Sequence, residues 1–284
     1  MFNNWIFWVV IYLITAVIFA QSFKVANKNM KSATSLTILL EILTCTFSII
    51  FIPFFKIKIA SDARTYIILF IVGLIYAVTD RLNTESRYGL APSTFSMLKQ
   101  LSSVFMLILS FIFLKEELVI NKILGAGLII IANFLLGLNK NGKFEYNKYF
   151  IYLIISNFLF AVAMLINTSL SSKFNIAIYT MITTGIPAII LTLTTKTTFK
   201  MLKDEFNLYD KKKFLLAAFC WNVMLISSVK AYEFGVVSIV APLLTLTSVL
   251  NTIYEFILNK DRKELILKLI VCLIIIFGVV LLKY

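Results

Sequence analysis

Charged side chains inside apolar stretches are the residues of this chain best placed to do chemistry. Lys99 stands seven residues into the apolar stretch 93–114, and no acidic residue lies within one helical turn of it. A lysine in apolar surroundings is costly unless it meets a counter-ion from another segment or from a ligand. Lys99 is therefore a candidate to bind a carboxylate or phosphate, although its long side chain can also extend to an interface near Pro92.

The third apolar stretch carries ionisable residues near its end. Its mainly apolar part, residues 66–78, would rise only about 20 Å as a helix, whereas a bilayer core is about 30 Å thick. A crossing helix must therefore bring Asp80, Arg81 and Glu85 into the membrane or its interface. Arg81 and Glu85 are four residues apart and can pair. The group either locks this helix to its neighbours or lines a cavity, where Asp80 or Glu85 would bind a proton or an amine and Arg81 an anion.

Other ionisable residues also lie at membrane depth. Glu41, about a third of the way into the second stretch, is a candidate proton site, whereas Glu255 lies near a stretch end and can reach the interface. Lys230 and Glu233, three residues apart, could form a gate; their place beside a stretch end favours a plain interfacial ion pair. Four amides are expected to bond helix to helix: Asn157, Asn167, Asn222 and Asn251.

Little in the chain suggests catalysis or a metal. There is no histidine, and Cys45, Cys220 and Cys272 lie in separate apolar stretches without metal-ligand spacing. No phosphate-cradling loop or large soluble domain is visible, which disfavours an ATP-driven pump. We predict no metal and no cofactor, and an enzyme or a channel is only a remote alternative.

These residues are carried by ten apolar stretches of nearly membrane-spanning length. The chain is 60% hydrophobic and 14% charged, against roughly 45–50% and 25% in soluble domains. Runs such as 128–131 are continuously apolar, which favours helices over outer-membrane strands. We predict an all-α membrane protein with spans near 5–22, 35–54, 65–88, 93–114, 121–138, 149–170, 176–195, 214–234, 237–258 and 264–282.

The net charge of +13 does not indicate nucleic-acid binding, because the lysines are scattered through short connections. The odd-numbered connections hold more lysine than the even-numbered ones. By the positive-inside rule the odd connections are expected on the cytoplasmic side and both termini outside.

The second half of the chain resembles the first. At a nearly constant spacing, Gly89 corresponds to Gly235, Glu116 to Asp261, and Asn133 to Gly278. We predict two five-helix repeats, 1–138 and 149–284, joined by a connecting loop at 139–148. Because five is odd, the second repeat enters the membrane from the opposite side, so the repeats are inverted, as in many secondary transporters.

These motifs resemble the drug/metabolite transporter (DMT) superfamily, of the ten-helix EamA-like kind. The likeness rests on Leu114-Lys115-Glu116 followed by Gly125-Ala126, and on Asp261 followed by Gly278; the family's usual proline is replaced by Ser103 and Ser248. The run Leu98–Ser103 also resembles the lysine-bearing fourth helix of nucleotide-sugar transporters, which implies that Lys99 meets a substrate phosphate. The family usually keeps both termini cytoplasmic, contrary to the lysine count.

The combined prediction is a secondary active transporter that exports a small polar metabolite by alternating access in the cytoplasmic membrane. Nearly balanced buried charges suit an amino acid or related zwitterion. A translocator of phosphorylated or nucleotide-linked sugars is the alternative. Substrate binding is assigned to Lys99, Arg81, Asp80 and Gln100, and proton coupling or gating to Glu41, Glu85, Lys230 and Glu233. The expected partners are the substrate, the bilayer and protons, with no nucleic acid, in a monomer or homodimer.

Overall fold

The computed structural model describes residues 4–26, 28–89, 98–99, 101–115, 119–137, 148–244 and 246–259, and the positions 270, 273–274, 277–278 and 281. All regular structure in these residues is helical, which confirms the predicted all-α class. Six of the described helices are long and apolar enough to cross a membrane: α1 (Trp5–Ala26), α2 (Ala33–Phe51), α3 (Ala63–Gly89), α7 (Lys148–Leu170), α8 (Ile176–Thr194) and α10 (Lys211–Phe234).

Four shorter helices lie in three of the remaining predicted stretches, 93–114, 121–138 and 237–258. They are α5 (Leu101–Phe113), α6 (Ile120–Gly137), α11 (Val237–Leu244) and α12 (Leu246–Asn259). Most of the stretch 264–282 lies outside the described residues. Short 3-10 turns at Ile52–Phe54 and Ser171–Lys173 follow α2 and α7. A further helix, α9 (Phe199–Phe206), was not predicted and lies in the connection between α8 and α10.

The helices begin where polar side chains can cap them. Ser32, Asn175, Thr198 and Asp210 each accept a hydrogen bond from a backbone N–H in the first turn of α2, α8, α9 and α10. These caps satisfy N–H groups that have no partner within the helix, and each typically stabilises a helix by about 1 kcal/mol. Local sequence thus sets where these four helices start.

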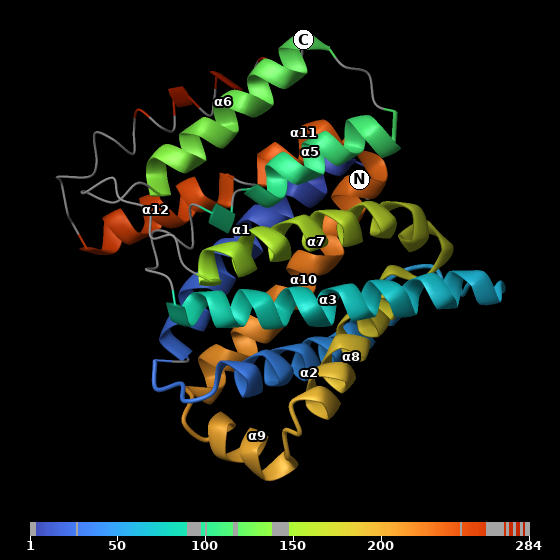
Figure 1. Cartoon of the computed structure of the whole chain (residues 1–284), viewed down its shortest axis with the longest axis vertical. Helices are drawn as coiled ribbons and strands as arrows, with labels where there is room; N and C mark the ends of the chain where they lie inside the picture. The colour runs from blue at the N-terminus through green and yellow to red at the C-terminus, as the bar shows by residue number, and fades with distance from the viewer. Residues whose placement is uncertain are drawn as a thin grey trace.

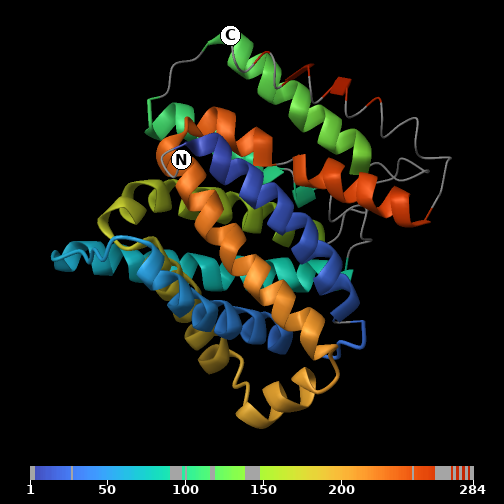
Figure 2. The same cartoon turned by 180° about the vertical axis from the view of Figure 1, so that it is seen from behind.

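Helices from the two halves of the chain interleave. The main packed pairs are α1 with α10, α3 with α7, α2 with α8, α3 with α8, α2 with α10, α5 with α7, and α5 with α11. Figures 1 and 2 show α1 and α10 side by side, and α9 beside the end of α8. The α3–α8 crossing is close because Gly73 lacks a side chain, and a Cβ there would lie 2.9 Å from Ile186 Cβ. The core draws on both halves of the chain, so neither half packs independently.

The outer faces of the helices are apolar and the inside contains hydroxyls. On α1, the exposed side chains Ile6, Val10, Ile14 and Ile18 repeat every four residues and form one lipid-facing stripe. Inside, Thr44 and Thr79 are fully buried, and each hydroxyl donates to the carbonyl one turn earlier. This distribution suits a bundle surrounded by lipid, because these two buried hydroxyls find a partner without water.

Candidate functional site

Lys99 is held by groups from two other helices. Its Nζ donates to Asn83 Oδ1 of α3 at 3.3 Å and lies 5.1 Å from the centre of the Phe160 ring of α7. Asp80, three residues before Asn83 on α3, is close enough for its charge to interact with that of Lys99. The predicted partner from another helix is therefore present. It consists of an amide oxygen, an aromatic face and a carboxylate.

Two carboxylates from neighbouring helices interact electrostatically near this lysine. Glu41 of α2 is 6% exposed, and its charge interacts with that of Asp80 across the α2–α3 contact. Among the residues that the structure describes, none forms a hydrogen bond with either carboxylate. A carboxylate at membrane depth is a candidate to meet a cation from the protein or from a substrate. Glu41, Asp80 and Lys99 together are called the central cluster below.

A hydrogen-bonded network of tyrosines and an amide continues from the central cluster. Asn167 of α7 donates to the Tyr76 hydroxyl of α3 at 2.5 Å, and its Oδ1 accepts a hydrogen bond from Tyr179 of α8. Tyr12 and Tyr76 in turn lie near Tyr232 of α10. Polar groups thus extend from Glu41 and Asp80 into the middle of the bundle, where an otherwise apolar core would exclude a polar solute.

The backbone around Lys99 is fixed by α7. The fully buried Asn157 donates from Nδ2 to the carbonyl of Leu98 at 2.7 Å, and Ser156 donates to the carbonyl of Thr79 at 3.0 Å. The Asn157 Oδ1 atom is buried without a hydrogen-bond partner among the described residues. Asn157 therefore positions the chain next to Lys99 and presents an unused acceptor in the interior.

Hydrogen bonds close the bundle at the end where α8 begins. Asn175 is 1% exposed, and its Nδ2 donates to the carbonyls of Ile52 and Phe55, both at 3.0 Å. Its N–H donates to the Lys58 carbonyl at 2.6 Å, while its Oδ1 caps α8. We call this group the Asn175 clamp. It ties the beginning of α8 to the connection that leaves α2.

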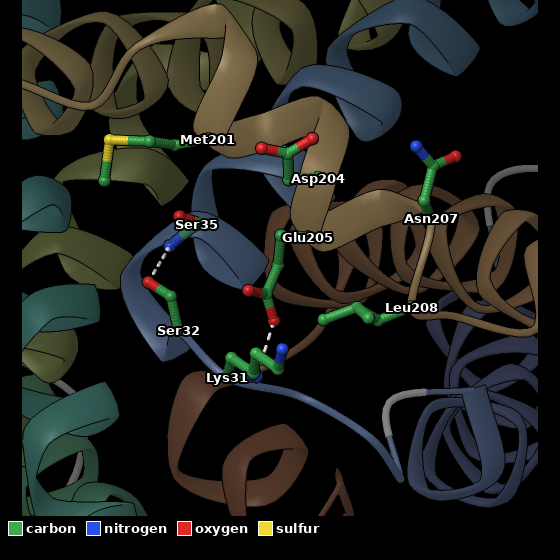
Figure 3. A pocket seen from close by; sticks show the side chains of 8 residues that line it. All are labelled: Lys31, Ser32, Ser35, Met201, Asp204, Glu205, Asn207 and Leu208. Carbon is green, nitrogen blue, oxygen red and sulfur yellow. Dashed lines mark hydrogen bonds between the residues drawn. The ribbon is translucent and has the colours of Figure 1, made fainter.

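A second set of hydrogen bonds closes the opposite end (Figure 3). Glu205 of α9 is 5% exposed and accepts from the Lys31 N–H at 2.8 Å and from the Tyr209 hydroxyl at 2.9 Å. The Asp210 N–H donates to the Ala26 carbonyl at 3.2 Å. We call this group the Glu205 clamp. It ties the turn before α2 to the connection that leaves α8, beside a hollow of about 370 Å³.

The comparisons with known proteins agree with this architecture. Residues 5–138 match the model of the EamA-like transporter family, part of the drug/metabolite transporter superfamily. These residues belong to the EamA-like transporter family. A crystal structure described only as that of a protein is similar over 97% of this chain and 94% of its own, with a TM-score of 0.76 and 12% identity, which shows a shared fold. No curated protein matches.

The match to the EamA-like family over residues 5–138 indicates a multi-pass membrane transporter rather than an enzyme. Two of the predicted charge pairs are present in the structure. Arg81 Nε and Glu85 Oε1 are 3.3 Å apart, but their side chains are 54% and 44% exposed and lie outside the central cluster. Lys230 and Glu233 are 2.7 Å apart and mostly buried, beside a hollow of about 430 Å³ that Trp8 also lines. Gln100 lies outside the described residues.

Several polar residues of this EamA-like chain matter more than their sequence context indicates. The expected helix-to-helix bonds of the four amides are confirmed, because Asn157 and Asn167 bond as described, Asn222 donates to the Thr44 carbonyl, and Asn251 accepts from Gln21. Asn83 and Phe160 were not selected from the sequence. Asn83 follows Asp80 by three residues and so shares its helix face, which is a usable signal. Nothing in the local sequence marks Phe160.

Proposed function

We propose that this chain is a secondary active transporter that exports an amino acid or a related zwitterion across the cytoplasmic membrane. The observation that carries the proposal is the central cluster, in which packing of α2 against α3 lets the charge of Glu41 interact with that of Asp80, and the charge of Asp80 with that of Lys99. Charges of both signs suit a solute that carries an ammonium and a carboxylate. A small zwitterion can pair with both at once, and its apolar part can contact the nearby aromatic rings.

The proposed transporter consists of two inverted five-helix repeats. If the repeats are equivalent, exchanging them must turn each packed helix pair into another packed pair. In this exchange α1 corresponds to α7, α2 to α8, α3 to α10 and α5 to α12. The packed pair α1–α10 then becomes α7–α3, α3–α8 becomes α10–α2, and α5–α7 becomes α12–α1. All six pairs are packed in the structure. The beginning of α8 bonds to the end of α2, so these two helices run in opposite directions. Because α2 and α8 are equivalent in the two repeats, their opposite directions support inversion.

Alternating access would proceed by rocking of the two repeats. The Asn175 and Glu205 clamps hold α2 and α8 together at both ends, and exchange of the repeats relates one clamp to the other. A pair of helices that is tied twice is suited to be the pivot. The opening movement would then occur where α3, α5, α10 and α11 surround the interior, on the side away from the clamps.

Proton coupling is proposed for Glu41 and Asp80. Two adjacent carboxylates in a water-poor interior cannot both remain charged without cost, so a proton or the substrate ammonium would occupy the pair at each step. Transport that is unaffected by a pH gradient and by an uncoupler would eliminate this part of the proposal and leave facilitated exchange.

An anionic sugar phosphate fits the central cluster less well. The cluster contains two carboxylates and one ammonium, and Arg81, the other candidate phosphate ligand, pairs with Glu85 on an exposed face. A phosphate of about two negative charges would meet more repulsion than attraction there.

Counterflow in proteoliposomes tests the proposal. The purified protein would be reconstituted and offered labelled amino acids, phosphorylated sugars and small cations, in parallel with Lys99→Ala. Lys213→Ala is the matched control, since Lys213 is half-exposed and pairs with Asp210 at the beginning of α10. We expect accumulation of a zwitterion by the wild type and the control, and its loss in Lys99→Ala. Counterflow of phosphorylated sugars alone, or of no solute, would overturn the proposal.

A further inference from the structure

The ammonium of Lys99 occupies a site that would suit other ammonium groups equally well. Asn83 Oδ1 accepts its proton at 3.3 Å, the Phe160 ring lies 5.1 Å from Nζ, and Asp80 supplies the opposite charge. We call these three groups the ammonium seat. They come from α3 and α7, whereas Lys99 itself precedes α5. The seat therefore remains in place when the lysine side chain moves.

The chemistry of the seat selects a primary ammonium. An amide oxygen requires a donor, an aromatic face attracts a cation, and a carboxylate excludes anions. None of these groups recognises the aliphatic stem of lysine. An amino group on a small molecule would meet the same amide oxygen and aromatic face, with the charge of Asp80 close enough to interact.

We propose that the ammonium seat is the binding site for the amino group of the transported solute, and that Lys99 occupies it as an internal substitute until the solute arrives. This inference rests on the proposed function, which supplies an amine-bearing solute. The incoming ammonium displaces the Lys99 ammonium, which then pairs with the carboxylate of the same solute. One lysine thus closes the empty site and recognises the other end of the substrate.

The backbone supports a movement of the side chain alone. Asn157 holds the Leu98 carbonyl, and the Ser102 hydroxyl donates to the Lys99 carbonyl at 2.9 Å, so both sides of the residue are fixed. The four-carbon stem of lysine has several rotatable bonds and can swing while its Cα stays in place. Lys99 is also only partly buried, which leaves it room to turn.

The proposal assigns specificity to the displacement step. A simple amine lacks a carboxylate, so if it displaced Lys99 it would bring no new group to pair with the lysine ammonium. A simple acid has no group for the seat. Only a molecule with both groups exchanges one satisfied ammonium for two satisfied charges, which favours zwitterions over both single-charge analogues.

Binding of n-butylammonium to Lys99→Ala tests the seat directly, because this ion is the severed end of the lysine side chain. Titration of detergent-purified protein, followed by thermal unfolding, should reveal saturable stabilisation of Lys99→Ala and none of the wild type. Adding Phe160→Leu should weaken the binding roughly 3- to 10-fold, the usual size of a cation–π contribution. Phe158→Leu, two residues away on α7 and 43% exposed, is the matched control and should leave binding unchanged.

The outcomes separate the seat from the transport function. No stabilisation of folded Lys99→Ala, or equal effects of the two phenylalanine substitutions, would overturn the seat even if the wild type transports a zwitterion. Stabilisation of Lys99→Ala together with no zwitterion counterflow by the wild type would support the seat and refute the proposed substrate. If Lys99→Ala does not fold, the single variants decide. Phe160→Leu must then weaken the apparent affinity for the zwitterion roughly 3- to 10-fold relative to Phe158→Leu, and equal affinities overturn the proposal.

Discussion

Replacing Asn175 by alanine should destabilise the bundle strongly, because this side chain has two separate roles. Its Oδ1 caps α8 through the N–H groups of Ala177 and Ile178, and its Nδ2 donates to two carbonyls of the connection that follows α2. Loss of a cap costs about 1 kcal/mol. A buried carbonyl left without a donor costs about 1–3 kcal/mol. Ile52 O keeps a second donor in the Phe55 N–H, so one carbonyl, that of Phe55, is counted.

The sum is about 2–4 kcal/mol, which corresponds to a decrease of about 4–16 °C in Tm at the roughly 2–4 °C per kcal/mol of large domains. Asn175→Asp keeps the capping oxygen and loses the donor, so its Tm should fall between those of the wild type and Asn175→Ala. Asn207→Ala is the control, because Asn207 is exposed and no side-chain hydrogen bond is found for it among the described residues. Thermal unfolding in detergent, followed by intrinsic fluorescence, measures all four proteins. A Tm of Asn175→Ala within about 1 °C of that of Asn207→Ala would refute the Asn175 clamp as a stabilising contact.

Three further predictions concern packing, the opposite clamp and pH. Gly73→Ala should lower stability by about 1–3 kcal/mol, because its methyl would collide with an isoleucine of α8, whereas Gly127→Ala has open space and should not; thermal unfolding distinguishes them. Glu205→Ala should speed tryptic cleavage in the α1–α2 turn relative to Asp204→Ala, which removes no hydrogen bond seen in the described residues. The Thr65 hydroxyl and N–H donate to the Asp62 carboxylate and hold its pKa below the ordinary value. These hydrogen bonds therefore stabilise the folded protein at pH values above the ordinary aspartate pKa, and the stabilisation is lost as pH falls through the lowered pKa. Asp62→Asn should remove that acid-induced loss in a pH series of unfolding midpoints.

The sequence predicts the helices because spans of this kind depend on local composition. Apolar length alone indicates α1 and α10, and the spacing of Arg81 with Glu85 and of Lys230 with Glu233 predicts ion pairs that depend only on helix geometry. The short helix α9 was not predicted because its eight residues mix apolar and charged side chains and contain no long hydrophobic run.

The partners of Lys99 could not be predicted from local sequence. The need for a partner follows from the lysine itself, but Asn83 and Phe160 are brought to it by packing of α7 against α3. The same applies to Asn175, whose neighbours Ile52 and Phe55 precede it by more than a hundred residues. Contacts of this kind depend on tertiary structure, which periodicity does not encode.

Accessibility of the interior from both sides of the membrane tests the central claim of alternating access most directly. Ser102 is suitable because it is half-buried and lies one turn from Lys99. In a chain whose three native cysteines are replaced by serine, Ser102→Cys would be exposed to a membrane-impermeant thiol reagent in right-side-out and in inside-out vesicles. The account predicts labelling from either side, with rates that change when the transported zwitterion is added. Labelling from one side alone under every condition, or from neither, would contradict it.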